Sequence, residues 1–133
     1  METLPRAPAG ITNIPLWEEH CRKIHARAKD LIEGKLSVLN AAVAIERLVF
    51  PARAGTDADL LVFKTISHET IGLPIGPERQ YWSEEALRRE DQKIHALEER
   101  WKLVALASAQ RLIERYSWAL DARRLRRRSD HDV

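Results

Sequence analysis

Residues 67–70 place a hydroxyl, an imidazole and a carboxylate side by side, in Ser67, His68 and Glu69. A nucleophilic hydrolase combines these groups, because a base must take the proton from the attacking hydroxyl. Adjacent residues on a helix point about 100 degrees apart, however, so these side chains cannot easily form one hydrogen-bonded relay. The chain also has no G-x-S-x-G turn. An enzyme with a site around Glu69, Arg79 and His68 is therefore a remote alternative, and we expect no catalytic residues.

His20, Cys21 and His25 come closest to a metal-ligand pattern. Zinc sites use cysteine or histidine pairs at defined spacings, such as two histidines four residues apart on a helix. His20 and His25 are five apart, which takes them off a common helix face. Cys21 and His25 could share a metal with Glu18, but Cys21 falls on an apolar stripe, which favours a small core residue. We expect no metal and no cofactor, and the glycine-rich patterns that bind nucleotide phosphates are absent from the sequence.

The C-terminal end of the chain is strongly basic. Five arginines there could neutralise phosphates and give a salt-dependent affinity for nucleic acid: Arg123, Arg124, Arg126, Arg127 and Arg128. They also suit the negative end of a long helix, or a solvated tail. The rest of the chain has nearly balanced charges and no basic stripe with interleaved aromatics. Nucleic-acid binding through this tail is therefore the alternative function, not the first.

A loop rich in glycine and proline runs from Gly72 to Trp82, between two segments with helical patterns. Gly72 and Gly76 permit backbone angles closed to other residues, and the prolines stiffen the path. We interpret the loop as a shaped connector, closed by an ion pair between Glu69 and Arg79 under Trp82. A preformed recognition loop is the functional alternative. The candidate structural or recognition residues are Glu69, Leu73, Pro74, Gly76, Arg79 and Trp82.

Apolar residues recur at three- and four-residue spacings along most of the chain, which predicts amphipathic helices. We expect helices over about residues 15–33, 38–50, 57–66 and 83–116, the last of which could continue into the arginines. Residues suited to helix ends stand at the boundaries: Pro15, Gly34, Ser37, Pro51, Asp57 and Ser83. Residues 60–66 would also suit a strand, but no other strand is present to pair with it, so the helix is favoured.

These elements predict an all-α fold, a compact bundle of about four helices with a long C-terminal helix. The first three helices are expected to pack around the N-terminal half of the fourth. The polar face of the long helix carries charges of both signs, which can pair among themselves or present a pattern to a partner. If Trp118 lies beyond the body of the domain, it would be a natural anchor for a dimer or another partner.

The bulk properties favour one globular domain. The chain has 133 residues, of which 44% are hydrophobic and 32% charged, and this length allows a core without disulfides. We divide it into a flexible N-terminal arm (1–14), a helical domain (15–120) and a basic tail (121–133). Cys21 is the only cysteine, which favours a reducing compartment. Without a signal sequence or an apolar segment of about 20 residues, we expect a cytoplasmic protein that does not enter a membrane.

A series of motifs covers residues 59–113: a Ser-Glu-Thr-like element, a Leu-Pro-x-Gly turn, an arginine three residues later and a tryptophan three beyond that. The chain supplies Asp59, Phe63, Glu69, Thr70, Leu73, Pro74, Gly76, Arg79, Trp82, Ala86, Leu87, Asp91 and Glu98, and upstream Gly34 and Ser37. This pattern resembles a family of small uncharacterised helical proteins of bacteria, although His68 interrupts the Ser-Glu element. The resemblance implies a bacterial helical protein and brings no activity with it.

The missing catalytic motifs, the mixed-charge helix and the shaped loop together predict a non-catalytic protein-interaction module. Small proteins of this style often accompany bacterial toxin systems as immunity partners, and a self-associating accessory protein is the other form considered. We therefore expect a protein partner or a homo-oligomer.

Overall fold

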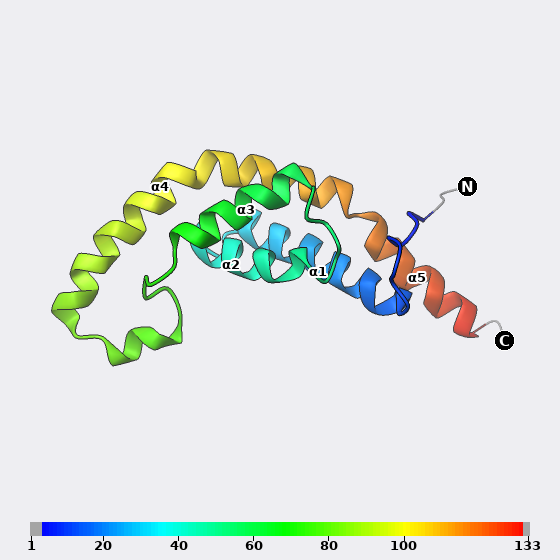
Figure 1. The fold of residues 1–133 in the computed structure, drawn as a ribbon, viewed down its shortest axis with the longest axis horizontal. Helices are drawn as coiled ribbons and strands as arrows, with labels where there is room; N and C mark the ends of the chain where they lie inside the picture. The colour runs from blue at the N-terminus through cyan, green and yellow to red at the C-terminus, as the bar shows by residue number, and fades with distance from the viewer. Residues whose placement is uncertain (1–3, 132–133) are drawn as a thin grey trace.

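The fold is built from helices alone in the part of the chain that the structure describes (Figure 1). The structure is a computed structural model that describes the backbone of residues 4–131 and the side chains of residues 4–125. Its elements are α1 (Ile14–Ile32), α2 (Val38–Val49), α3 (Ala58–Glu69), the 3-10 helix η1 (Pro77–Tyr81), α4 (Glu84–Arg115) and α5 (Trp118–His131). The predicted all-α fold is confirmed, including a helix over residues 60–66.

Local capping sets the helix boundaries. The hydroxyls of Ser37 and Ser83 each accept a hydrogen bond at 3.2 Å from the backbone amide three residues later, at the starts of α2 and α4. The Asp57 carboxylate accepts two backbone amides at the start of α3, and Pro15 occupies the first turn of α1. Gly34 has a φ of +75° just after α1, a conformation that glycine adopts without cost. These boundaries agree with the sequence prediction.

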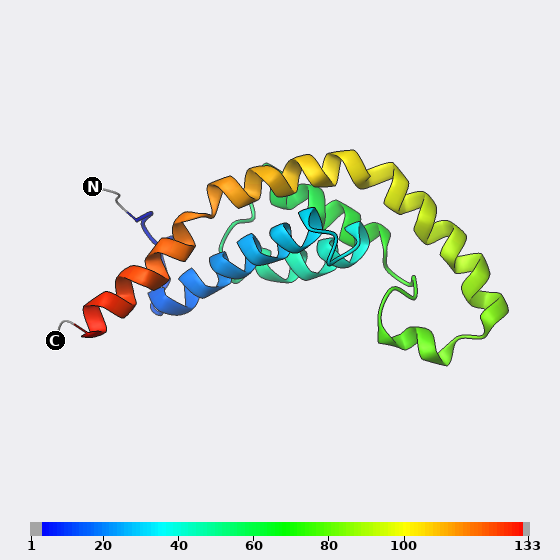
Figure 2. The same cartoon turned by 180° about the vertical axis from the view of Figure 1, so that it is seen from behind.

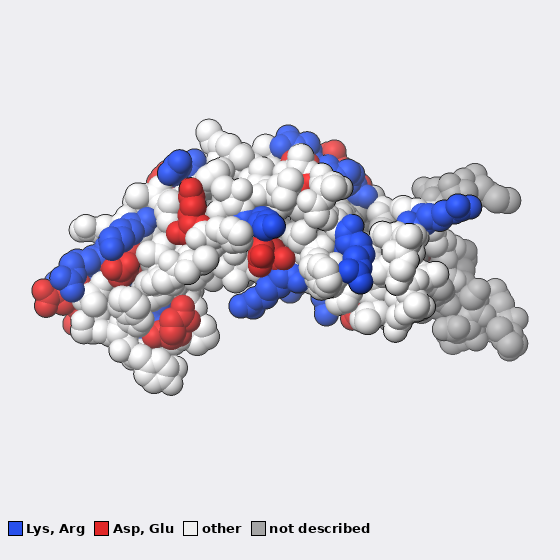
Figure 3. Space-filling view, viewed as in Figure 1, with Lys and Arg blue, Asp and Glu red and all other residues white. Residues whose placement is uncertain are grey.

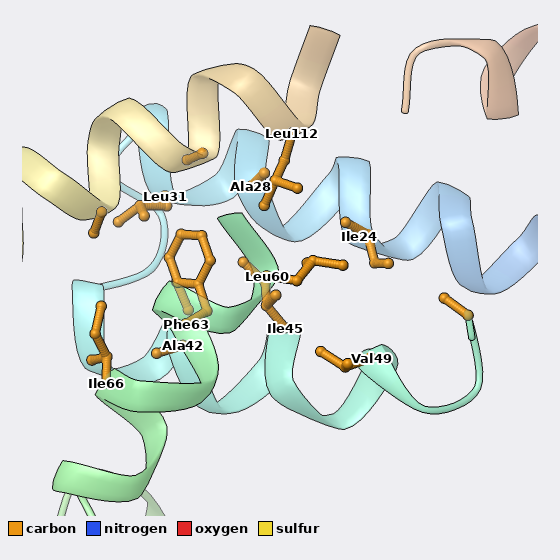
Figure 4. Close-up of a cluster of buried hydrophobic side chains, with 14 of the residues drawn as sticks. Ile24, Ala28, Leu31, Ala42, Ile45, Val49, Leu60, Phe63, Ile66 and Leu112 are labelled. Atoms are coloured by element: carbon orange, nitrogen blue, oxygen red, sulfur yellow. The ribbon is translucent and has the colours of Figure 1, made fainter. Parts of the chain in front are cut away.

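The hydrophobic core lies between α1, the α2–α3 pair and α4 (Figures 1 and 2). Phe63 of α3 is fully buried and lies among side chains from the other helices (Figure 4). Ile45 of α2 and Leu112 of α4 are also fully buried. Each such side chain contributes roughly 1.5–3 kcal/mol by leaving water, so the contacts in this zone stabilise the helical body.

The long helix α4 contacts the body through its C-terminal half. Its four buried residues are Ala105, Ser108, Ala109 and Leu112. Three of them are small and lie at three- and four-residue spacings, which lets neighbouring helices approach closely. The N-terminal half instead leads away from the body (Figures 1 and 2). The prediction that the first three helices pack around the N-terminal half was therefore wrong, because an apolar stripe does not reveal which part of it a neighbour covers.

A short break at residues 116–117 separates α4 from α5, so the long helix does not continue unbroken into the arginines. Trp118, just after the break, is half-buried and stacks on Trp17 with ring centroids 5.2 Å apart. The indole of Trp17 donates a hydrogen bond to the carbonyl of Ala52 at 3.0 Å. Trp118 therefore packs into the body, and the hypothesis of an anchor beyond the body does not apply to it.

Residues 4–13 form an irregular segment before α1. Ala7 and Ile11 within it are partly buried and pack against the core, and the amide of Ile11 donates to the carbonyl of Pro8 at 3.3 Å. Among the described residues, no helix combines the length and apolar character needed to cross a bilayer.

Candidate interaction surface

Residues 71–97 form an extension that projects from the helical body, at the end far from both termini (Figures 1 and 2). The extension consists of a loop, η1 and the first turns of α4. Pro74 is its one buried residue, and between residues 75 and 104 no residue is buried. The sequence-predicted cluster lies here: Glu69 ends α3, and Leu73, Pro74, Gly76, Arg79 and Trp82 follow within the loop and η1.

Arg79 closes the extension on itself. Its guanidinium donates to both carboxylate oxygens of Asp91 on α4, at 2.7 and 3.0 Å, and to the backbone carbonyl of Pro74 at 2.9 Å. The hydrogen bonds from Arg79 hold the pKa of Asp91 below its ordinary value. A planar guanidinium suits this two-oxygen contact. The loop and the start of α4 are thereby joined as one unit.

The predicted ion pair between Glu69 and Arg79 is not formed. Arg79 pairs with Asp91, while Glu69 accepts a hydrogen bond at 2.6 Å from the indole nitrogen of Trp101. The prediction relied on the short separation of Glu69 and Arg79 along the chain. The return of α4 over the loop brings Asp91 to Arg79 instead, and no local pattern announces that contact.

The base of the extension is fixed by a second contact from α4. The Glu98 carboxylate accepts hydrogen bonds from the amides of Val38 and Leu39 at 2.9 and 3.0 Å. These amides belong to the first turn of α2, where backbone N–H groups have no partner within the helix. A negative charge is favourable at this positive end. Sequence reasoning did not assign this role, since about 60 residues separate the partners. With the bond from Trp101 to Glu69, Glu98 fixes where the extension leaves the body.

The two glycines of the loop differ in their backbone conformation. Gly72 has a φ of +85°, as predicted for a position closed to other residues. Gly76 has a φ of −121°, which other residues can adopt, so the prediction for Gly76 was wrong. Its amide donates to the Glu78 carboxylate at 3.2 Å, and a Cβ there would lie 2.7 Å from an oxygen of that flexible side chain.

Apolar side chains are exposed on the extension and beside it. Ile71 is 79% exposed, Tyr81 84% and Trp82 38%. Trp82 therefore does not cover a buried ion pair. A cleft of about 460 Å³ separates the loop from α2, with Val43, Ala44 and Ile75 in its lining. Arg47 on α2 and Glu78 on the loop also line it and supply charges of opposite sign. A cleft that combines apolar side chains with polar and charged groups is suited to a protein segment.

A polar network on the opposite side of the body has a structural role. Asp59 is buried and accepts hydrogen bonds from Arg111 at 2.9 Å and Arg115 at 2.8 Å, while Arg115 also contacts both oxygens of Asp57 at 2.7 Å. Burial raises the pKa of Asp59, but the hydrogen bonds from Arg115, Arg111 and Ser108 outweigh it, so the pKa lies below the ordinary value. The network fastens the start of α3 to α4.

The groups of the catalytic and metal alternatives do not come together. Glu69 and Arg79 each bond to other partners, and His68 is exposed. Burial raises the pKa of the Cys21 thiol to about 12, which keeps it protonated, and burial lowers the pKa of His25. Within residues 4–125, no three histidine, cysteine or acidic residues are grouped as metal ligands would be. Cys21 is a core residue at 1% exposure.

The arginine tail is only partly described. Arg123 and Arg124 are exposed on α5, and Arg124 bonds to Asp121. Arg126, Arg127 and Arg128 fall within α5, but their side chains lie outside the described residues. On the face drawn in Figure 3, positive and negative side chains are interspersed along the extension and the body, without a large patch of one sign.

Comparisons with models of known protein families, with curated proteins and with solved structures gave no match. The resemblance to a bacterial family of helical proteins therefore stays a prediction.

Proposed function

We propose that this chain is a non-catalytic protein-interaction module that contacts its partner with the extension. The observation that carries the proposal is the ordered helix and loop of the extension, in which Pro74 is the one buried residue. An isolated helix of this size is marginal in water, since most helical stability comes from packing. Within the extension, Ile94 and Leu97 are only partly buried against the core. Polar contacts at Arg79, Glu69 and Glu98 add to this partial packing.

A connector between α3 and α4 does not need an extension of this length. Helices in bundles are usually joined by about 2–8 residues, whereas here a loop of residues 70–83 leads out and the first turns of α4 lead back. The tip of this excursion exposes Tyr81 and Trp82, and aromatic residues are enriched at protein interfaces. The contacts of Arg79 fix the loop before a partner binds, which reduces the conformational entropy lost on association.

Two kinds of partner fit this surface. One is a second copy of the chain, which would make it a self-associating accessory protein. The other is a different protein, such as a toxin that the chain neutralises as an immunity-type inhibitor. The single cysteine and the prediction of a reducing compartment are in keeping with a cytoplasmic partner.

Exposed residues of the extension provide the test. Tyr81→Ser and Ile71→Ser remove apolar surface from the extension and leave the core intact, since both residues are exposed. Leu103→Ser is the matched control, because Leu103 is 81% exposed on α4 outside the extension. Sedimentation velocity over a range of concentrations measures self-association. Capture of other proteins on each immobilised variant of the chain measures binding of a different partner.

We expect association or capture to be lost in the Tyr81→Ser and Ile71→Ser variants and kept in the Leu103→Ser variant. A chain that stays monomeric, and whose captured proteins are the same for all variants, would contradict the proposal. Loss of binding in the Leu103→Ser variant alone would place the interface on the outer face of α4 and would also contradict it.

Nucleic-acid binding is the second candidate, favoured by the exposure of Arg123 and Arg124 on a helix that leads away from the body (Figure 1). Binding of a labelled DNA or RNA fragment would be measured at increasing salt, with the full chain and with a chain that ends at residue 122. Binding through the tail requires an affinity that falls steeply with salt and is lost on truncation. An affinity that neither treatment changes would exclude this function.

A further inference from the structure

The C-terminal end of α2 carries a groove that the extension does not use. This concave surface of about 390 Å³ is lined by Glu46, Val49, Phe50, Arg53, Gly55 and Lys64. Phe50, the residue that follows α2 as its C-cap, is 74% exposed. The groove lies at the end of α2 opposite to Val38, where Glu98 fixes the extension. It is therefore a separate feature of the body.

Arg53 occupies this groove in a strained backbone conformation. Its φ of +54° makes it the one non-glycine residue with a positive φ in the described part of the chain. The turn is a helix C-cap in which the Ala54 amide donates to the carbonyl of Val49 at 3.0 Å, and glycine is the usual residue at such a position. An arginine there is less favourable for folding, so its presence points to a role of the side chain.

The Arg53 guanidinium lies 4.6 Å from the centre of the Phe50 ring. The pair stands at the surface and adds little to the core, because Phe50 is mostly exposed. Lys64, on α3, supplies a second cation. Neither Arg53 nor Lys64 forms an ion pair with another residue described in the structure. Both cations are thus available to an anion, and Val49 and Phe50 supply apolar surface in the same lining.

The charges in the lining also limit the size of the anion. Arg53 and Lys64 contribute two positive charges and Glu46 one negative charge, which leaves one net positive charge. This balance fits a single carboxylate and disfavours a polyphosphate, which Glu46 would repel. Val49 and Phe50 offer apolar surface for a flat or aliphatic body attached to that carboxylate.

We propose that this groove binds a small organic monocarboxylate. Arg53 and Lys64 hold the carboxylate, while the apolar part of the ligand rests on Val49 and Phe50. This site is independent of the extension and of the proposed protein partner.

The test is an NMR titration of isotope-labelled protein with benzoate. Acetate, which lacks the apolar body, and benzamide, which lacks the charge, are the comparison probes. We expect saturable shifts of the amides of Phe50, Gly55 and Lys64 with benzoate, and binding about tenfold weaker with acetate or benzamide, the loss expected when one charged hydrogen bond or a comparable apolar contact is missing. Equal affinity for acetate and benzoate would show an adventitious ion only and overturn the proposal.

Arg53→Gly is the most informative variant, because glycine suits the turn and the fold is retained or stabilised. We expect Arg53→Gly and Lys64→Met each to weaken benzoate binding about tenfold, with the Arg53→Gly variant melting no lower than the wild type. Undiminished binding in the Arg53→Gly variant would contradict the site. The Tyr81→Ser variant should bind benzoate normally, so failure of this inference and failure of the protein-interaction proposal give different results.

Discussion

In the helical body, Phe63, Leu60 and Leu112 are fully buried, whereas in the extension Pro74 is the one buried residue. The body is ordered by removal of apolar surface from water. The extension buries its apolar residues only in part, as at Ile94 and Leu97. It adds polar contacts: the two-oxygen pair of Arg79 with Asp91, and the bonds of Glu69 and Glu98 at its base. One helix, α4, belongs to both regions and is buried only in its C-terminal half.

The chain can thus present a shaped surface without weakening its core. A hydrophobic extension would need to be buried and would tend to aggregate. Polar contacts help to fix the shape of the extension, while its Ile71, Tyr81 and Trp82 side chains stay exposed. Substitutions should therefore divide into two groups, those that change global unfolding and those that change only the extension.

The largest effect is expected from the core. Phe63→Ala removes a fully buried ring at the contact of α2, α3 and α4, and we expect it to lower the free energy of unfolding by about 3–5 kcal/mol. Urea denaturation followed by circular dichroism measures this. A loss below about 1 kcal/mol would mean that the body is not held by this cluster.

The next effect is expected from the buried carboxylate of the polar network. Asp59→Asn weakens the bonds to Arg111 and Arg115, and we expect a loss of about 2 kcal/mol, the value of a charged hydrogen bond. The pKa of Asp59 is lower in the folded chain than its ordinary value of 3.8. Its contribution is therefore fully present above pH 3.8 and is lost as the pH falls through the folded pKa.

The pH dependence supplies the control for that variant. Urea denaturation at a series of pH values between 6 and 3 should show the wild type losing more stability than Asp59→Asn toward the acid end, since the variant lacks the titrating group. Parallel curves for the two proteins would show that Asp59 is not linked to folding in this way.

A smaller effect is expected at the base of the extension. Glu98→Gln removes the negative charge that accepts the Val38 and Leu39 amides, and loss of such a cap typically costs about 1 kcal/mol. The same denaturation experiment measures it. Glu99→Gln on the neighbouring exposed position is the matched control, and an equal loss in both variants would argue against a specific cap.

The smallest effect on global stability is expected within the extension. Arg79→Met breaks the contacts with Asp91 and with the carbonyl of Pro74. Because these groups are exposed, we expect global unfolding to be unchanged and cleavage by a protease in residues 72–82 to become faster. Unchanged cleavage would show that Arg79 does not order the loop.

The helix boundaries could be read from the sequence because their signals are local. Ser37, Asp57 and Ser83 cap the helices that follow them, and each acts within three residues of itself. The helical choice over residues 60–66 was correct for a different reason, namely that no strand was available as a partner.

The partners within the candidate site could not be read in the same way. Asp91 and Glu98 meet Arg79 and α2 only after α4 has folded back, and nothing in the local pattern encodes that register. The apolar residues Ile94 and Leu97 continue the stripe of the buried half of α4, although they are only half-buried. A periodic pattern therefore identified the helix but not the half of it that joins the core.

Native-state hydrogen exchange of the wild-type chain tests most directly whether the extension is a unit ordered separately from the core. We expect the amides of α4 at residues 88–96 to open with free energies well below that of global unfolding, while those at residues 105–112 exchange only through global unfolding. Equal protection of the two halves of α4 would contradict this expectation, because the extension would then share the stability of the body.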